Sequence, residues 1–280
     1  MVSLTDVNYI YMKGGPFEKL AVRDINLKLE KGEFIGLIGH TGSGKSTLVQ
    51  LMAGLVKPTS GEIKIGDKVL HARGTDMRKL RFEIGLVMQY PEYQLFEETV
   101  FKDIAFGPSN MNLPEEEIQR RVHFAADLVG LPEEVLEKSP FDLSGGQKRR
   151  VAIAGVLAME PKLLILDEPT AGLDPAGRDE ILGKIRDMHR RLGITVVLVS
   201  HSMEDIAGIA DRIVVMNRGR VAMADKTGEV FKYPDKLKEM GLSVPQVTQV
   251  CAELRAAGIP IPEGIYTIGA AKAEIEKLLK

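Results

Sequence analysis

The fold of this chain is decided by the stretch Gly39-His40-Thr41-Gly42-Ser43-Gly44-Lys45-Ser46-Thr47, which lies between the apolar run Phe34–Ile38 and the helical sequence Leu48–Met52. Its pattern is Gly-x-x-x-x-Gly-Lys-Ser in a strand–loop–helix setting. The glycines permit a tight loop whose backbone N–H groups converge on phosphate oxygens, and the helix N-terminus adds a positive partial charge. Lys45 supplies a full charge for the β and γ phosphates, and the Ser46 hydroxyl is placed to ligate Mg²⁺. The stretch therefore predicts nucleotide binding, against the alternative of a flexible Gly/Ser turn.

Short apolar runs recur after this loop. The middle runs are nearly continuous in Val, Ile and Leu, as parallel strands buried on both faces are. Helix-like segments alternate with most of them, which predicts an α/β architecture. The runs expected to be strands are Phe34–Ile38, Ile84–Met88, Leu163–Leu166, Ile194–Val199 and Ile213–Met216.

Residues 91–160 contain no convincing strand and predict an all-helical insertion into the α/β core. Pro114 precedes three glutamates, which are favourable at a helix start, and Gly130 ends the same helix. The spacing of its apolar residues places them on one face. We expect a main domain over residues 1–225 that contains this helical subdomain.

The composition changes at about residue 225, where prolines become frequent. Two short helices are expected in this tail, at Pro245–Ala257 and Ala270–Leu279, and Gly258 follows the first of them. We interpret residues 226–280 as a small accessory or dimerisation domain.

Polar side chains follow several of the expected strands, at the edge of the sheet where ligands of α/β proteins bind. Gln89 follows one strand, Asp167 and Glu168 end another, and Ser200-His201 follows a third. Asp167 would hold Mg²⁺ through water, and Gln89 would contact the metal or the attacking water. Glu168 is the better general base, and His201 would sense or position the γ phosphate. Each residue alone has a structural alternative, so their joint placement carries the hypothesis.

A second glycine motif, Leu143-Ser144-Gly145-Gly146-Gln147, precedes a helix expected over about Lys148–Met159. Ser144 and Gln147 form a capping box, a normal way to start a helix. A cap does not need two glycines, however, and glycines let backbone N–H groups approach an anion closely. The chain is therefore expected to carry two phosphate-binding helix starts.

Together these motifs resemble those of ABC-type ATPases, in the order of that family and over residues 1 to about 220. The resemblance implies a P-loop NTPase fold, with a RecA-like core, an inserted α-helical subdomain and a small N-terminal antiparallel β region. The matching segments are the Walker A loop Gly39–Thr47, the Q-loop Gln89, the signature Leu143–Gln147, Walker B Leu163–Glu168, the D-loop Ala171-Gly172-Leu173-Asp174, the switch His201 and the adenine-stacking Tyr11. Tyr9, two residues before Tyr11, is the alternative for the stacking residue.

The resemblance also implies a head-to-tail dimer. Each ATP would lie between the Walker A loop of one subunit and the Ser144-Gly145-Gly146 turn of the other, so an isolated subunit is expected to hydrolyse ATP poorly. Closure of the dimer when ATP binds, and its opening after hydrolysis, would supply the work of the protein.

ABC proteins with these motifs include ATPase subunits of membrane transporters, soluble ATPases of chromosome maintenance or DNA repair, and tandem proteins that act on ribosomes. DNA-repair and chromosome types carry long heptad coiled coils, and ribosomal types carry two phosphate loops in one chain; this sequence has neither. The net charge of −2, from 37 basic and 39 acidic residues, also argues against a nucleic-acid binder. No apolar run is long enough to cross a membrane. We expect an ATPase subunit of a transporter, peripheral on the cytoplasmic face of the cell membrane.

Within that class, Gln89–Phe96, Val100–Pro108 and Leu143–Pro161 resemble ATPases of energy-coupling-factor importers of vitamins or transition-metal ions such as cobalt. His40-Thr41 and Pro91–Phe96 look more like the second of two ATPase paralogues. Such complexes join two ATPases, alike or paralogous, to a transmembrane coupling subunit and a substrate-binding membrane subunit. An ordinary ABC importer is the alternative.

The segment after Gln89 offers a docking hypothesis. Its acidic and aromatic side chains form a surface suited to a basic helix of the membrane partner, although a solvated acidic turn is the alternative. The residues expected in this surface are Glu92, Tyr93, Phe96, Glu97 and Glu98.

Overall fold

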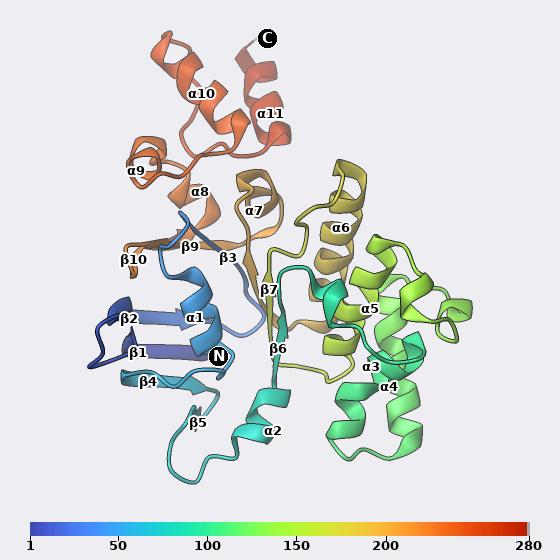
Figure 1. The fold of residues 1–280 in the computed structure, drawn as a ribbon. Coiled ribbons are helices and arrows are strands. Elements are labelled where there is room, and N and C mark those ends of the chain that lie inside the picture. The colour runs from blue at the N-terminus through green and yellow to red at the C-terminus, as the bar shows by residue number, and fades with distance from the viewer. Residues whose placement is uncertain (279–280) are drawn as a thin grey trace.

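The computed structural model describes residues 1–278 and contains two sheets, a helical subdomain and a helical tail (Figure 1). The larger sheet has the order β10-β9-β3-β8-β7-β6, in which all neighbours are parallel except β10 and β9. Its strands are β3 (Phe34–Gly39), β6 (Ile84–Val87), β7 (Leu163–Asp167), β8 (Thr195–Val199), β9 (Arg212–Asn217) and β10 (Arg220–Lys226). The predicted α/β fold and all five predicted strands are confirmed.

Two details of this sheet differ from the prediction. Met88 and Ile194 lie just outside their strands. The edge strand β10 was not predicted, because its residues are only partly buried and its sequence lacks a continuous apolar run. By contrast, β3 and β8 are buried at every position, which is why their sequences are almost entirely apolar; the buried Thr195 in β8 donates its hydroxyl to the carbonyl of Glu30 at 3.1 Å.

The smaller sheet is antiparallel, with the order β2-β1-β4-β5. It matches the N-terminal β region that the family resemblance implied. Its strands alternate buried and exposed side chains, and its buried face packs on α1 (Lys45–Met52), the helix after the phosphate loop. The strands are β1 (Val2–Tyr11), β2 (Lys19–Leu29), β4 (Ser60–Ile65) and β5 (Lys68–Val69), and α2 (Met77–Phe82) follows them.

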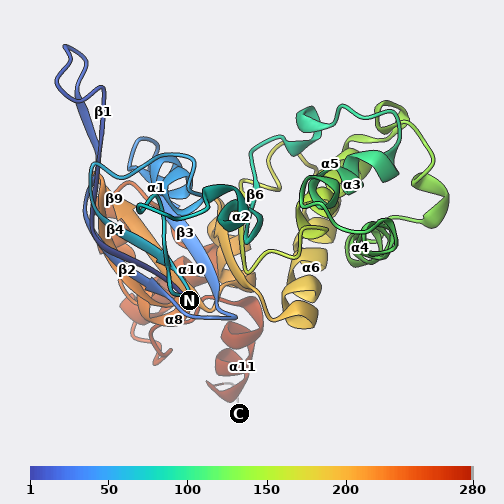
Figure 2. The same cartoon turned by 90° about the horizontal axis from the view of Figure 1, so that it is seen from below.

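The helical subdomain lies to one side of the larger sheet, as Figure 2 shows. No strand occurs between residues 91 and 160, as predicted. Helix α5 begins at Gly145 rather than near Lys148, so the two glycines form its first turn behind the cap of Ser144. The elements are η1 (Pro91–Gln94), α3 (Val100–Asn110), α4 (Glu115–Val129), η2 (Glu133–Val135), η3 (Pro140–Asp142) and α5 (Gly145–Leu157).

Two further helices cover the larger sheet, α6 (Pro175–Leu192) and α7 (Met203–Ile209). The tail that follows contains α8 (Thr227–Val230), α9 (Pro234–Glu239), α10 (Gln246–Ala256) and α11 (Ile268–Leu278). Both predicted tail helices are present; the second starts two residues earlier than expected, and Leu279 at its predicted end lies outside the described residues.

The tail joins the body of the protein through its first half. Phe231, Leu237 and Leu242 belong to the main hydrophobic core, whereas α10 and α11 share a small core of their own around Cys251 and Ile265. A domain boundary at residue 225 remains a prediction. None of the helices within residues 1–278 has the length and apolar character that a membrane span requires.

Candidate functional site

A cavity of about 520 Å³ opens at the carboxyl ends of β3, β7 and β8, beside the end of β1. It contains the phosphate loop and the polar residues that the sequence placed after three different strands, so the predicted convergence at one sheet edge is present in the structure. The lining residues are Tyr11, Lys19, Leu20, Ala21, Thr41, Gly42, Gly44, Lys45, Ser46, Thr47, Gln89, Asp167, Glu168, Val199, His201, Arg218 and Gly219.

The phosphate loop depends on its glycines. Gly44 has φ 104°, and a Cβ there would lie 2.7 Å from the carbonyl oxygen of Ala21, so no other residue fits. The Lys45 ammonium donates hydrogen bonds to the carbonyls of Gly39 at 2.5 Å and His40 at 3.2 Å. Burial lowers the pKa of Lys45, and the nearby carboxylates of Asp167 and Glu168 oppose that shift. The loop therefore holds a desolvated cation that gains from an anionic ligand.

Tyr11, rather than Tyr9, lies on the wall of the cavity. Its hydroxyl is 3.2 Å from Oγ1 of Thr47 and donates to Oε1 of Gln50 at 3.3 Å, which fixes the ring against α1. Tyr9 packs edge-on against it, with ring centroids 4.8 Å apart. This arrangement favours Tyr11 as the surface for a planar base.

Glu168 has the properties of a general base. Its backbone is left-handed (φ 52°), and its N–H donates to the carbonyl of Val199 at 3.0 Å. One carboxylate oxygen, Oε1, is buried, has no hydrogen-bond partner among residues 1–278 and lies 3.5 Å from Nε2 of His201. Burial, reinforced by the negative charge of Asp167, raises the pKa of Glu168 to about 7. A base with a pKa near the working pH is well matched to proton transfer.

Burial also shifts the pKa values of the ionisable residues next to Glu168. Burial raises the pKa of Asp167, with the charge of Lys45 opposing the shift. Burial also lowers the pKa of His201, and the positive charge of Lys45 adds to this shift, so the site favours the neutral imidazole.

The signature turn lies outside this cavity. Ser144 caps α5 by accepting the N–H of Gln147 at 3.3 Å, and Gln147 accepts the N–H of Ser144 at 3.1 Å. Apart from the neighbouring residues and the backbone of its own helix, a Cβ added to Gly145 or Gly146 would meet no atom of residues 1–278 within 4 Å. The packing of this chain therefore does not demand either glycine. Asp174 does not line the cavity either; it caps α6 by accepting the N–H of Gly177, at 2.7 Å.

The structure corrects one predicted docking residue. Glu92 does not belong to a free acidic surface, because its carboxylate accepts hydrogen bonds from the Arg149 guanidinium at 2.8 and 3.2 Å and its side chain is only 17% exposed. The turn that begins at Pro91 directs Glu92 toward α5. Tyr93 and Phe96 are 83% and 58% exposed, and Glu98 forms a surface pair with Lys102 at 2.6 Å.

Part of the cavity wall was not predicted from the sequence. Arg218 and Gly219 form the two-residue turn between β9 and β10, with φ 48° and 79°, the left-handed pair typical of tight hairpins. The Gly219 N–H donates to the carbonyl of Ser43 at 2.8 Å and its carbonyl accepts the N–H of Arg23 at 2.7 Å, which joins the phosphate loop to β2. The Arg-Gly pair between apolar runs was the available signal.

Comparisons with known proteins agree with this geometry. A family model described as ABC transporter matches residues 22–171. The "Energy-coupling factor transporter ATP-binding protein EcfA2" of Caldanaerobacter subterraneus subsp. tengcongensis is 54% identical across 100% of this chain and 98% of its own length. Its counterpart in Clostridium tetani is 55% identical across 99% and 96%.

Two solved structures are also similar. CbiO1 of Clostridium perfringens, described as part of the ABC transporter complex cbiONQ, gives a TM-score of 0.76 at 40% identity and covers 90% of this chain and 98% of its own. A dimeric post-hydrolysis form of the ATP-binding cassette MJ0796, bound to ADP and Pi, gives 0.71 at 31% identity and covers 81% and 98%.

Proposed function

The chain belongs to the ABC transporter ATPases, among the ATP-binding proteins of energy-coupling factor transporters, and from that premise we propose that it energises uptake of vitamins or transition-metal ions through a membrane coupling subunit. As a member of this family it is an ATPase that binds ATP and drives transport. The observation that carries the proposal is a single cavity that joins Lys45, Glu168 and His201, in a chain similar to such proteins along its whole length.

In the proposed reaction, the phosphate loop and Lys45 bind the triphosphate, and Tyr11 stacks on the adenine. Glu168 accepts the proton of the water that attacks the γ phosphorus, the bond from that phosphorus to the β–γ bridging oxygen breaks, and ADP leaves. His201 hydrogen-bonds to the γ phosphate. Phosphoryl transfer requires positioning and charge neutralisation more than covalent participation by the protein. The desolvated Lys45 meets the need for charge neutralisation, and the raised pKa of Glu168 suits it to accept the proton of the attacking water.

The same cavity fits Mg²⁺. Ser46, Asp167 and Gln89 present the hard oxygen donors that Mg²⁺ prefers, and the ion usually takes few ligands from protein when it is bound with a phosphate. Burial of Asp167 makes a positive charge beside its carboxylate favourable. Mg²⁺ would neutralise charge on the phosphates, with Ser46 as a direct ligand and Asp167 acting through water.

Hydrolysis is proposed to require a second subunit, either another copy or a paralogue. Ser144, Gly145 and Gly146 are exposed or half-buried and lie outside their own chain's cavity, as expected for groups that contact the ATP of a partner. The pair would sit on the cytoplasmic face of the cell membrane, held by a transmembrane coupling subunit and a substrate-binding membrane subunit.

Purification from the native membrane tests the proposed function directly. A coupling subunit and a small substrate-binding membrane protein are expected to co-elute with this ATPase. Co-elution of a two-component permease and a separate soluble binding protein would instead identify an ordinary ABC importer and contradict the proposal.

Replacing Tyr11 by alanine is expected to weaken ATP binding about tenfold, because stacking on an aromatic ring contributes roughly 1–3 kcal/mol per base. Tyr11→Phe is the matched control: it keeps the ring and loses only the hydroxyl contacts to Thr47 and Gln50, so it should bind ATP almost normally. Equilibrium titration with ATP measures both. If Tyr11→Ala binds ATP normally and Tyr9→Ala binds it weakly, the adenine stacks on Tyr9 instead of Tyr11.

The docking surface, redefined as Tyr93, Phe96, Glu97 and Glu98, borders a groove of about 530 Å³ between α3 and α5. The groove is lined by apolar side chains such as Phe106, Val151 and Val156. An apolar groove beside acidic side chains suits an amphipathic helix with basic residues, and we place the coupling subunit there.

Charge reversal of Glu97 and Glu98 to lysine is expected to release the ATPase from the membrane complex and to leave ATP binding unchanged, because neither residue lies on the nucleotide cavity. Co-purification with the membrane subunits is the measurement. Reversal of Glu133 and Glu134, an exposed acidic pair on η2, adds the same charge elsewhere and should not affect assembly. Equal co-purification of the two double variants would reject this surface.

A further inference from the structure

Arg149, in the second turn of α5, connects three segments of the chain through one buried guanidinium. Its side chain is 3% exposed. It donates to both carboxylate oxygens of Glu92, at 2.8 and 3.2 Å, and also to the carbonyls of Pro169 and Ala171, at 3.0 and 2.9 Å. The signature helix, the turn after Gln89 and the segment after Glu168 are therefore joined at one group.

The segment that Arg149 holds carries the proposed base. Residues 169–171 directly follow Glu168, whose left-handed backbone is unusual for a residue other than glycine and persists only where the surroundings impose it. Within the same segment, the Thr170 hydroxyl donates to the buried carboxylate of Asp205 at 3.3 Å. Asp205 lies in α7, which begins just after His201.

We propose that Arg149 is a positioning residue for ATP hydrolysis, which fixes the segment after Glu168 to the turn that contains Glu92 and so makes the orientation of Glu168 depend on the docking surface. This rests on the proposed function. A buried, bidentate Arg–carboxylate pair has a fixed geometry, and its two ends move together. A partner that displaces the turn beside Tyr93 therefore also displaces the carbonyls next to Glu168.

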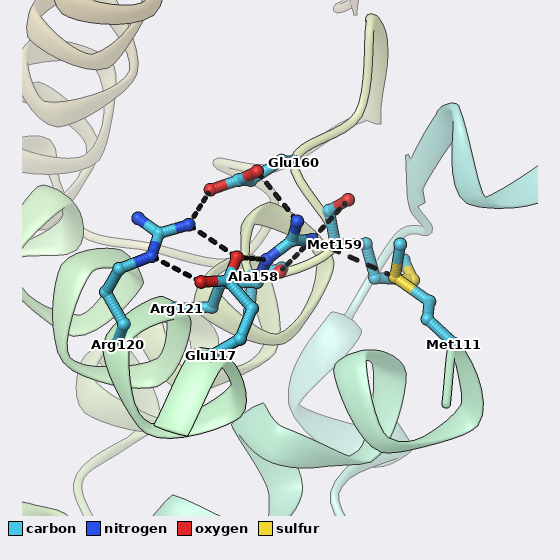
Figure 3. Close-up of polar contacts among 7 residues, drawn as sticks. All are labelled: Met111, Glu117, Arg120, Arg121, Ala158, Met159 and Glu160. Atoms are coloured by element: carbon cyan, nitrogen blue, oxygen red, sulfur yellow. Dashed lines mark hydrogen bonds and ion pairs between the residues drawn. The ribbon is translucent and has the colours of Figure 1, made fainter. Parts of the chain in front are cut away.

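A second arginine provides a matched control at the other end of α5 (Figure 3). Arg121 of α4 is 12% exposed and donates to the carboxylate of Glu117 at 2.7 Å, and it pairs with Glu160 at 3.0 Å. It also donates to the carbonyls of Ala158 and Met159, at 3.5 and 3.4 Å. Arg121 thus donates hydrogen bonds to carboxylate and main-chain carbonyl oxygens, as Arg149 does. It contacts neither the turn that contains Glu92 nor residues 169–171.

The test compares Arg149→Lys with Arg121→Lys in the intact transporter complex. Lysine keeps the charge but loses the planar fork that reaches several acceptors at once. Because a displacement of about 1 Å in a catalytic group costs about 10²-fold in rate, we expect Arg149→Lys to lower kcat about 10- to 100-fold with little change in KM for ATP. Arg121→Lys should retain kcat, even where the two variants lower the unfolding midpoint equally.

Equal kcat values for the two variants would overturn the proposal. If Arg149→Lys does not assemble, Glu92→Gln is measured in its place, since it removes the charge of the pair at nearly constant size; wild-type kcat in that variant would likewise overturn it. A Glu168→Gln complex separates the two levels of inference. If the Glu168→Gln complex still turns over ATP, the proposed catalytic mechanism fails. If the Glu168→Gln complex is inactive while the Arg149→Lys complex has wild-type kcat, the catalytic mechanism stands and only the role proposed for Arg149 is wrong.

Discussion

Glu168→Gln is expected to bind ATP as the unchanged protein does and to lose turnover by about 10²–10⁴-fold, the usual contribution of a general base. The substitution keeps the size of the side chain and removes its ability to accept a proton. Burial gives this carboxylate a pKa of about 7, so its basicity is far higher than that of an exposed glutamate. The loss should appear in kcat for ATP hydrolysis by the assembled transporter, with an unchanged dissociation constant for ATP.

Glu83→Gln is the matched control for this experiment. Glu83 is similarly buried, but it pairs with Lys68 and Lys162 at 2.5 and 2.9 Å and lies outside the nucleotide cavity. Its amide variant is expected to retain turnover and to lose some stability. Near-normal turnover by Glu168→Gln would remove Glu168 from the mechanism and leave His201 or a solvent water as the proton acceptor.

The parallel strands and the polar residues that follow them were predictable from sequence for the same physical reason. Strands such as β3 and β8 are buried on both faces and are therefore almost entirely apolar, and their carboxyl ends meet at one edge. The edge strand β10 escaped prediction because half-exposed positions tolerate polar residues. Local pattern therefore specifies the centre of the sheet better than its margin.

The misassignment of Glu92 has a different cause. Its partner Arg149 is 57 residues away along the chain, and nothing in either local pattern indicates that they meet. The same holds for Arg218 and Gly219, which join the cavity only because the β9–β10 turn folds against the phosphate loop. Tertiary contacts of this kind decide whether a charged residue on a turn is free to bind a partner.

The other large effect is expected at the signature turn, where Gly145→Asp should leave the isolated chain folded and able to bind ATP. The reason is geometric: Gly145 is exposed, a Cβ there meets no atom within 4 Å, and the residue does not line the nucleotide cavity of its own chain. Unfolding midpoint and ATP affinity of the isolated subunit measure both expectations. Gly269→Asp, at an equally open position in the first turn of α11, controls for the added charge.

In the assembled transporter, by contrast, Gly145→Asp should reduce turnover about a thousandfold. Two unit charges 4 Å apart repel by about 4 kcal/mol at an effective dielectric constant of 20, and each 1.36 kcal/mol changes a rate tenfold. That repulsion exists only if the turn of one subunit faces the triphosphate of the other. Gly269→Asp lacks such a neighbour and should retain turnover. If Gly145→Asp hydrolyses ATP as fast as Gly269→Asp, then no phosphate lies near the turn and the shared site is refuted.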